Sequence, residues 1–237
     1  MGSGGNNDVA YSTAHLNPRQ VEGTPVEFSG LIKGKLLGWF FTSPARAILN
    51  WKMGNPDPRM MELLALQGGE TVVDFGSGSG HHSMMVAKEL TAGSGKVIAC
   101  DVSTEMIDRL KVLSAKRGVA DRIDTRVEDA LNLSSVATGS ADCSISVATW
   151  HHVHGDLSIL DKICAEMVRV LKPGGRFCVC DVGIDTKLAH DRALGKAVKA
   201  HSRPFGINDM ESIMAKGGLK DRKVEKVGRW VIGFGVK

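Results

Sequence analysis

The sequence has few cysteines, no long apolar run and no strong charge of one sign. Its five cysteines include no CxxC pair, which favours reduced thiols over a disulfide framework. Cys178 and Cys180 alternate with apolar residues, and one such pair supplies too few ligands for a zinc site. No apolar run reaches the roughly 18 residues that a membrane-spanning helix requires, and no signal peptide is recognisable. We therefore expect a cytoplasmic protein.

The net charge of +4 is small, and the Lys and Arg residues are scattered along the chain. A dedicated nucleic-acid-binding protein would show a basic stripe or a stacking motif, so no nucleic acid partner is expected. A chain of 237 residues with 43% apolar composition can bury the core of one domain with an appended segment. The sequence gives no indication of the oligomeric state.

Three segments follow one another along the chain. Residues 1–25 are rich in Gly, Asn and Ser, which predicts a flexible arm. Residues 26–56 carry apolar and aromatic residues at helical spacing, with Ser43-Pro44 as a helix start. Asp57-Pro58 is a second helix start of this kind, and it opens the third segment, residues 57–237, which is the predicted main domain.

From Glu70 onward, apolar strands alternate with glycine-containing turns and amphipathic helices. This alternation predicts an α/β fold with a doubly wound, mostly parallel seven-stranded sheet covered by helices on both faces. The last two strands are separated only by a short turn, so they pair as an antiparallel C-terminal hairpin. The predicted strands are TVVDF, KVIACD, RIDTRVE, CSISVAT, RFCVCDV, DRKVEKVG and WVIGFGV, and helices are predicted to begin near Gly80, Ser103, Leu157, Thr186 and Asn208.

The turn after the first strand, VVDFGSGSGHH, places Gly76, Gly78 and Gly80 on alternate positions. In such a sheet this turn holds the ligand, and glycine lets the backbone come close to it. A dinucleotide fingerprint needs a third glycine at position 81 or 83, where the chain has His81 and Ser83. A nicotinamide cofactor and a dehydrogenase are therefore disfavoured.

Carboxylates follow the first three strands. Asp74 would repel pyrophosphate, but it suits the cationic amino-acid end of S-adenosylmethionine (SAM). Asp101 lies 21 residues after Gly80, near the spacing of an acidic residue that accepts from ribose hydroxyls. Val102 and Met106 suit one face of adenine, and Asp129 suits its amino group. Acidic strand ends that merely cap helices remain the simpler alternative.

These motifs resemble those of class I SAM-dependent methyltransferases over about residues 57–237. VVDFGSGSG is similar to the glycine motif, VIACDVS to the ribose motif and RVEDA to the adenine motif. RVLKPGGRFCVCD and WHHVHG are similar to the branch with ubiquinone and menaquinone C-methyltransferases. The resemblance implies a Rossmann-like fold, SAM as cofactor and S-adenosylhomocysteine as product. The predicted cofactor contacts are Asp74, Gly76, Ser77, Gly78, Gly80, Asp101, Val102, Met106, Glu128, Asp129, Ala130, Ala148 and Thr149.

Five of the eight histidines come directly after the first and fourth predicted strands, which are neighbours in the expected order. We therefore expect these histidines to converge at one edge of the sheet. An acceptor that must lose a proton needs a base, and histidine suits that role near neutral pH. His152 is the first candidate and His151 the second, with structural packing as the alternative. His81 and His82 are expected to shape the cofactor site.

A metal site among these imidazoles is the alternative, and no metal is predicted. The reason is that no carboxylate and histidine pair has ligand spacing on one helix face.

The acceptor is expected to be a small, apolar or aromatic molecule. Residues 26–56, with Trp39 and Phe40, are interpreted as a lid over it, and Trp150 and His154 as further substrate contacts. A cover for the sheet edge and peripheral membrane contact are the alternatives for this segment. The atom that is methylated stays open. Two other function classes stay open. One is an RNA or protein methyltransferase, which is disfavoured because no NPPY-like segment follows the fourth predicted strand. The other is a non-catalytic SAM-binding module.

Overall fold

The computed structural model describes residues 54–153, 157–182 and 206–237. The predicted arm 1–25, residues 26–53 of the predicted lid and the helix expected near Thr186 lie outside the described residues. Within the described ranges, no helix is both long and apolar enough to cross a membrane.

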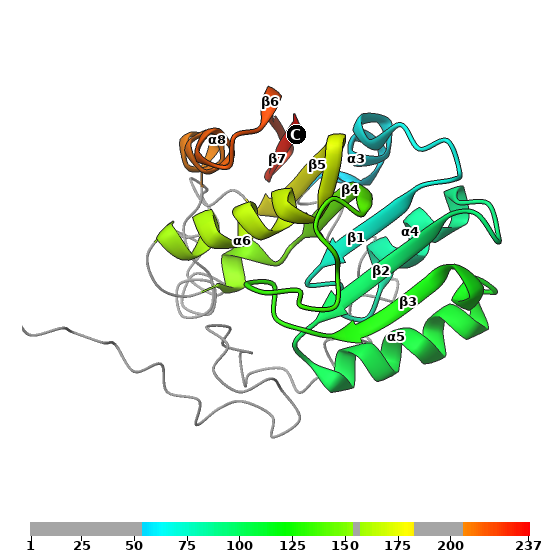
Figure 1. The fold of residues 1–237 in the computed structure, drawn as a ribbon. Coiled ribbons are helices and arrows are strands. Elements are labelled where there is room, and N and C mark those ends of the chain that lie inside the picture. The colour runs from blue at the N-terminus through cyan, green and yellow to red at the C-terminus, as the bar shows by residue number, and fades with distance from the viewer. Residues whose placement is uncertain (1–53, 154–156, 183–205) are drawn as a thin grey trace, which may run out of the picture.

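The sheet has seven strands in the order β3-β2-β1-β4-β5-β7-β6 (Figure 1). Strands β1 to β5 run parallel, whereas β7 pairs antiparallel with both β5 and β6. The predicted doubly wound sheet with an antiparallel C-terminal hairpin is confirmed. The strands are β1 Thr71–Phe75, β2 Lys96–Asp101, β3 Ile123–Val127, β4 Ala141–Val147, β5 Leu171–Val182, β6 Lys220–Val227 and β7 Trp230–Val236.

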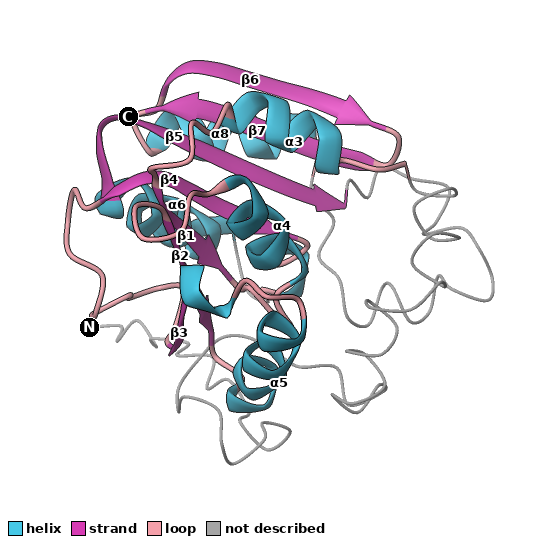
Figure 2. Ribbon diagram, turned by 90° about the vertical axis from the view of Figure 1, so that its right-hand side faces the viewer, coloured by secondary structure: helices cyan, strands magenta, loops and turns pink. Residues whose placement is uncertain are grey.

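Helices cover both faces of the sheet, because successive strand residues point to opposite sides. Val72 packs toward α3 (Asp57–Leu64), α4 (His81–Glu89) and α5 (Thr104–Lys116). Val73 packs toward α6 (Leu157–Val170) and α8 (Ile207–Lys216). Figure 2 shows β6 and β7 side by side at one edge of the sheet and β3 at the other. Two apolar cores therefore hold one central sheet.

Local signals explain where several elements begin. Ser103 caps α5 by accepting a hydrogen bond from Met106 N at 3.3 Å. Asp209 Oδ2 accepts from Gly206 N at 2.9 Å at the start of α8. The short helices η1 (Ala120–Arg122) and η2 (Trp150–His152) precede β3 and follow β4. Strand β5 begins at Leu171, earlier than predicted, because Leu171 pairs with Ala141 ahead of the Pro-Gly-Gly turn.

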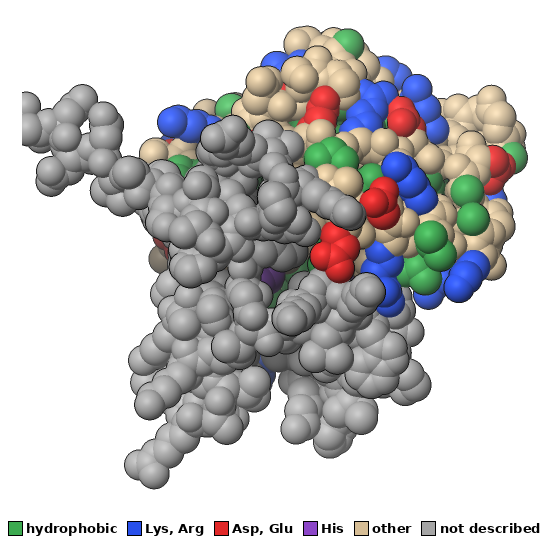
Figure 3. Space-filling model, turned by 90° about the horizontal axis from the view of Figure 1, so that it is seen from below, with side chains coloured by type: hydrophobic (Ala, Val, Ile, Leu, Met, Phe, Trp, Pro, Cys, Tyr) green, Lys and Arg blue, Asp and Glu red, His purple; other side chains and the backbone are tan. Residues whose placement is uncertain are grey.

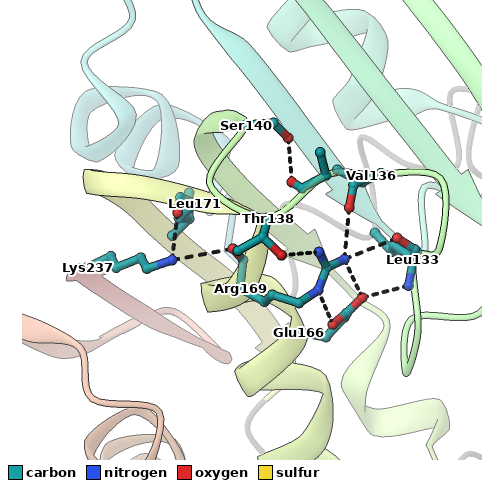
Figure 4. Close-up of polar contacts among 9 residues, drawn as sticks. Leu133, Val136, Thr138, Ser140, Glu166, Arg169, Leu171 and Lys237 are labelled. Atoms are coloured by element: carbon teal, nitrogen blue, oxygen red, sulfur yellow. Dashed lines mark hydrogen bonds and ion pairs between the residues drawn. The ribbon is translucent and has the colours of Figure 1, made fainter.

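A polar network fixes the amino-terminal edge of β4 and β5 (Figure 4). The Arg169 guanidinium donates to Leu133 O at 3.1 Å and Val136 O at 2.9 Å, and it pairs with Glu166 at 2.7 Å. Lys237 Nζ donates to Leu171 O at 2.7 Å. These bonds anchor the loop before β4 and the C-terminal residue. The network lies where β4 and β5 begin. The glycine turn follows the end of β1, and because these strands are parallel it lies at the opposite edge of the sheet.

Candidate functional site

The glycine turn is tied to the strands beside β1. The N–H groups of Gly76 and Ser77 both donate to Cys100 O at 2.9 Å. Thr149 Oγ1 donates to Gly76 O at 3.1 Å from the other side. A Cβ on Gly76 would lie 2.3 Å from Thr149 Cγ2, and the φ of Gly76 is +70°. Glycine at this position therefore lets the ends of β1, β2 and β4 meet.

The next two glycines have different surroundings. A Cβ on Gly80 would lie 1.9 Å from Leu110 Cδ1, so this glycine permits the packing of α5. No described atom lies within 4 Å of the position that a Cβ on Gly78 would take. The buried Ser77 Oγ beside it has no hydrogen-bond partner among the described residues. Open space next to an unpaired buried hydroxyl fits a polar ligand at this turn.

Asp101 closes the turn from the end of β2. Its Oδ2 accepts from Gly78 N at 2.8 Å, and its Oδ1 accepts from Ser103 N at 2.9 Å. The carboxylate is buried, which raises its pKa, while the two N–H bonds act in the opposite direction. Asp101 is thus held in a fixed orientation beside the open space at Gly78.

Asp74 is buried beneath the same turn. Ser83 Oγ donates to its Oδ2 at 2.5 Å. Burial raises the pKa of Asp74 to about 7 despite the Ser83 hydrogen bond, and the charge of Asp101 adds to the rise. A carboxyl group with such a pKa gains from a nearby cation, which would stabilise its ionised form.

The segment after β3 borders the same region. Glu128 N donates to Asp101 O at 3.1 Å, which ties the two strand ends together. Glu128 Oε2 is buried and has no partner within the described ranges. Asp129 Oδ1 accepts from Leu131 N at 2.9 Å, and burial raises the pKa of Asp129. The partly buried Ala130 follows. These groups offer acceptors to a ligand on the β2 and β3 side of the turn.

The predicted adenine-side residues are buried next to Asp101. Val102 follows Asp101 directly, and Met106 lies in the first turn of α5. Ala148, at the end of β4, has a φ of +55°, which is unusual for a residue with a Cβ. Such strain is most common at functional sites, and here it precedes Thr149 at the glycine turn.

A histidine is oriented by a buried carboxylate after β4. His151 Nδ1 lies 2.6 Å from Asp181 Oδ1, and His151 N donates to Asp181 Oδ2 at 3.2 Å. Val182 N donates to Oδ1 at 2.6 Å. Burial raises the pKa of Asp181, but the charge and hydrogen bond of His151 and the Val182 N–H outweigh it, so the pKa is below its ordinary value. Sequence reasoning did not select Asp181, although it lies within the quoted RFCVCD motif.

Of the other residues predicted on the substrate side, the structure describes His152 and Trp150. The His152 ring lies against His151, with centroids 3.9 Å apart. Trp150 is fully buried and packs edge-on against Phe177, so the structure places its ring in the core and not at the surface of the site. His154, Trp39 and Phe40 lie outside the described residues.

The histidines after β1 contact a different carboxylate. His82 Nε2 lies 3.2 Å from Asp57 Oδ1, and His81 Nε2 lies 3.4 Å from Asp57 Oδ2. Strands β1 and β4 are neighbours, as expected. The two histidine pairs nevertheless belong to two groups, one held by Asp57 and the other by Asp181.

Comparison with known proteins identifies the domain. Residues 72–175 match the methyltransferase domain family. An arsenite methyltransferase from Halobacterium salinarum is 27% identical over 75% of this chain and 45% of its own length. A 27-O-demethylrifamycin SV methyltransferase from Amycolatopsis mediterranei is 24% identical over 73% and 62%. A demethylmenaquinone methyltransferase from Thermobifida fusca is 33% identical over 55% and 51%. The chain thus spans about half the length of these relatives.

Solved structures share the fold. A SAM-dependent methyltransferase from Aquifex aeolicus superposes with a TM-score of 0.66 at 20% identity, over 86% of this chain and 98% of that one. Geranyl diphosphate C-methyltransferase from Streptomyces coelicolor, in complex with S-adenosylhomocysteine, gives 0.61 at 16% identity over 76% and 74%.

The fold, the glycine turn and the matched domain together define a methyltransferase domain that uses SAM. Residues 72–175 carry a methyltransferase domain and the chain shares the fold of solved SAM-dependent methyltransferases, so the predicted resemblance to the class I SAM-dependent methyltransferases is confirmed. The unpaired Ser77 hydroxyl, the open space at Gly78 and the unpaired Glu128 oxygen fit this cofactor.

Proposed function

We propose that this protein transfers the methyl group of SAM to a small organic acceptor and that His151 is the base that takes the acceptor's proton. The observation that carries the proposal is the contact between His151 Nδ1 and the buried Asp181 carboxylate at 2.6 Å. A base with an orienting carboxylate behind it is a recurring arrangement in catalysis. This choice differs from the sequence-based preference for His152.

The contact defines the role of each atom. Asp181 has a lowered pKa, so it is ionised near neutral pH and accepts the proton of His151 Nδ1–H. In that tautomer the lone pair lies on Nε2, which is the atom that can accept a proton. Asp181 also accepts from His151 N, which fixes the residue's backbone. Asp181 is thus a positioning residue, and His151 is the proposed catalytic residue.

Bound SAM supplies a methyl group on a positively charged sulfur, and the chain's own residues bind and orient it. We assign Asp74 to the amino-acid end, Asp101 to the ribose hydroxyls and Asp129 to the adenine amino group. Fixed carboxylates of this kind suit charge-assisted hydrogen bonds. The other predicted contacts are Gly76, Ser77, Gly78, Gly80, Val102, Met106, Glu128, Ala130, Ala148 and Thr149.

The nature of the acceptor is supported by the relatives and by the cysteines. Several relatives are named for organic acceptors, including demethylmenaquinone and a rifamycin. The arsenite methyltransferase is a less suitable guide, because a soft acceptor such as arsenite is best bound by accessible thiolates. All five cysteines are buried, and burial raises the pKa of Cys100, Cys143 and Cys164. We therefore propose an apolar or aromatic organic acceptor.

A macromolecular acceptor has less support from the surface. On the face shown in Figure 3, the Lys and Arg side chains of described residues lie among Asp and Glu side chains and form no continuous basic patch. RNA-binding surfaces usually carry such a patch. For the same reason we propose no nucleic acid partner.

The test is transfer of labelled methyl from SAM into a cell extract, followed by separation into organic, aqueous small-molecule and macromolecular fractions. Label in the organic fraction is the expected result, and it should be lost with His151→Gln. Label on RNA or protein would overturn the substrate class. Cofactor binding without transfer to any fraction would instead indicate a SAM-binding module.

A further inference from the structure

Three side chains outside the proposed cofactor contacts converge next to the glycine turn. Asp57 is the first residue of α3, and His81 and His82 form the first turn of α4. One ligand atom from each of them lies within 4.8 Å of the other two. The two histidine-to-carboxylate distances are 3.2 and 3.4 Å.

We propose that Asp57, His81 and His82 bind one divalent transition-metal ion, with Zn²⁺ as the best match. Ligand atoms in a tetrahedral site, each about 2.0 to 2.2 Å from zinc, stand about 3.3 Å apart. The distances from His82 Nε2 to Asp57 Oδ1 and from His81 Nε2 to Asp57 Oδ2 are close to this value, and the three ligand atoms, one from each residue, lie within 4.8 Å of one another. Imidazole nitrogens with one carboxylate oxygen suit Zn²⁺ and similar ions, whereas Mg²⁺ prefers oxygen ligands.

The arrangement of the two histidines is unusual for neighbours on a helix. Adjacent helical residues normally point in different directions, yet both Nε2 atoms reach the same carboxylate. Their rings meet edge-on, with centroids 4.8 Å apart and planes at 82°. The side chains that carry the three ligand atoms are partly shielded, with 14% of Asp57, 14% of His82 and 25% of His81 exposed. Competition from bulk water is therefore limited at these three side chains.

The supports of the site are rigid. Met60 of α3 and Met84 of α4 pack in the same buried core against the sheet, so both helices are held in place. His81 directly follows Gly80 of the glycine turn. Three protein ligands leave a coordination position open for water or for an oxygen or nitrogen donor. The site thus adjoins the glycine turn and does not depend on the proposed methyl transfer.

The competing interpretation is that Asp57 only accepts hydrogen bonds from the two imidazoles. Ligand spacing on one helix face does not reveal this site, because the carboxylate belongs to α3 and the two histidines belong to α4. Metal affinity separates the two interpretations, and it is measured without any acceptor.

The experiment uses the full chain without an affinity tag, treated with EDTA and titrated with Zn²⁺ against a chromophoric chelator. We expect one ion per chain and a rise in the midpoint of thermal unfolding on binding. Asp57→Asn and His82→Gln should each weaken binding by at least about 100-fold, because loss of even a supporting residue costs 10–100-fold. Co²⁺ should give visible absorption bands in the parent protein that both variants lack.

His151→Gln is the matched control, because it removes one imidazole from the other histidine group and should bind Zn²⁺ like the parent. Should His151→Gln lose the ion as well, the metal is bound elsewhere. No stoichiometric binding by the parent overturns the proposal. If Asp57→Asn fails to fold, His81→Gln provides the second test of the same site.

Discussion

The Nδ1 atom of His151 lies 2.6 Å from Oδ1 of Asp181, a carboxylate with no exposed surface. The two residues come from neighbouring strand ends, His151 after β4 and Asp181 within β5. A buried carboxylate that faces an imidazole fixes both the ring's orientation and its tautomer. This pair is therefore the chemical centre of the proposed methyl transfer.

Replacing Asp181 should slow catalysis without affecting the cofactor. Asp181→Asn no longer holds His151 in the required tautomer, so kcat should fall by about 100-fold or more, the scale of general base catalysis. SAM affinity, measured by calorimetry, should stay within a few-fold. His151→Gln should have a similar effect, and the double variant should be little worse than either, because the residues act as a unit.

The control for this pair is Asp142→Asn, which lies in β4 at the opposite edge and pairs with Lys172. Its rate should equal that of the parent. A larger loss in His152→Ala than in His151→Gln would reverse our assignment of the base.

The stability of the protein without cofactor should fall as the pH rises, because of Asp74. Its pKa is raised to about 7 in the folded state from an ordinary value of 3.8. Between these values the folded state holds a proton that the unfolded state has lost, so stability decreases with rising pH. From about pH 6 to about pH 8 this group should cost about 1.4 kcal/mol.

Asp74→Asn should remove that part of the pH dependence, measured by urea unfolding at both pH values. The same variant should bind SAM more weakly, because an amide cannot neutralise the cofactor's ammonium group. An unchanged pH slope in Asp74→Asn would show that the carboxyl does not titrate in this range.

The fold could be predicted because its signals are local. The strand TVVDF leads directly into the glycine turn at Gly76, and strands that are buried on both faces of a sheet appear in the sequence as apolar runs. The short turn between β6 and β7 allowed only a hairpin. The start of β5 was predicted late because Leu171 precedes a Pro-Gly-Gly segment that looks like a loop, although it pairs with Ala141.

The proposed site was only partly predictable, because its key pairs join distant residues. Asp101 and the glycine turn could be predicted because each lies at the end of a strand that the sequence shows as an apolar run. Asp181 is 30 residues from His151, and Asp57 is 25 from His82, so no spacing rule connects them. Trp150 was predicted to contact the substrate because it precedes the histidines, yet its side chain is fully buried in the core.

Two alanine substitutions in the glycine turn should affect different properties, one the stability of the fold and the other the affinity for SAM. Gly80→Ala forces its Cβ against Leu110, so it should destabilise the protein by about 1 to 3 kcal/mol, the usual cost of overpacking. Gly78→Ala meets no described atom and should mainly weaken SAM binding by occupying the open space. Both also carry the strain of a positive φ.

The measurements are chemical unfolding and SAM titration of both variants. Adding Leu110→Ala to Gly80→Ala should cost less stability than Leu110→Ala costs in the parent protein, since it removes the side chain that clashes with the new Cβ. Normal SAM affinity in Gly78→Ala would mean that the cofactor does not approach this glycine.

The Arg169 network should affect stability and leave cofactor binding unchanged. Arg169→Ala removes the donor to Leu133 O and Val136 O and leaves Glu166 without its cation, so unfolding free energy should fall by about 2 to 4 kcal/mol. Arg169→Lys should recover little, because an ammonium group cannot reproduce the forked contacts of the guanidinium.

Lys216→Ala, which removes an exposed ion pair with Asp161, should change stability by less than about 1 kcal/mol. SAM affinity should be equal in all three variants, because the network lies at the opposite edge of the sheet from the glycine turn. A loss of SAM affinity in Arg169→Ala at temperatures where the variant is folded would show that the two edges are coupled.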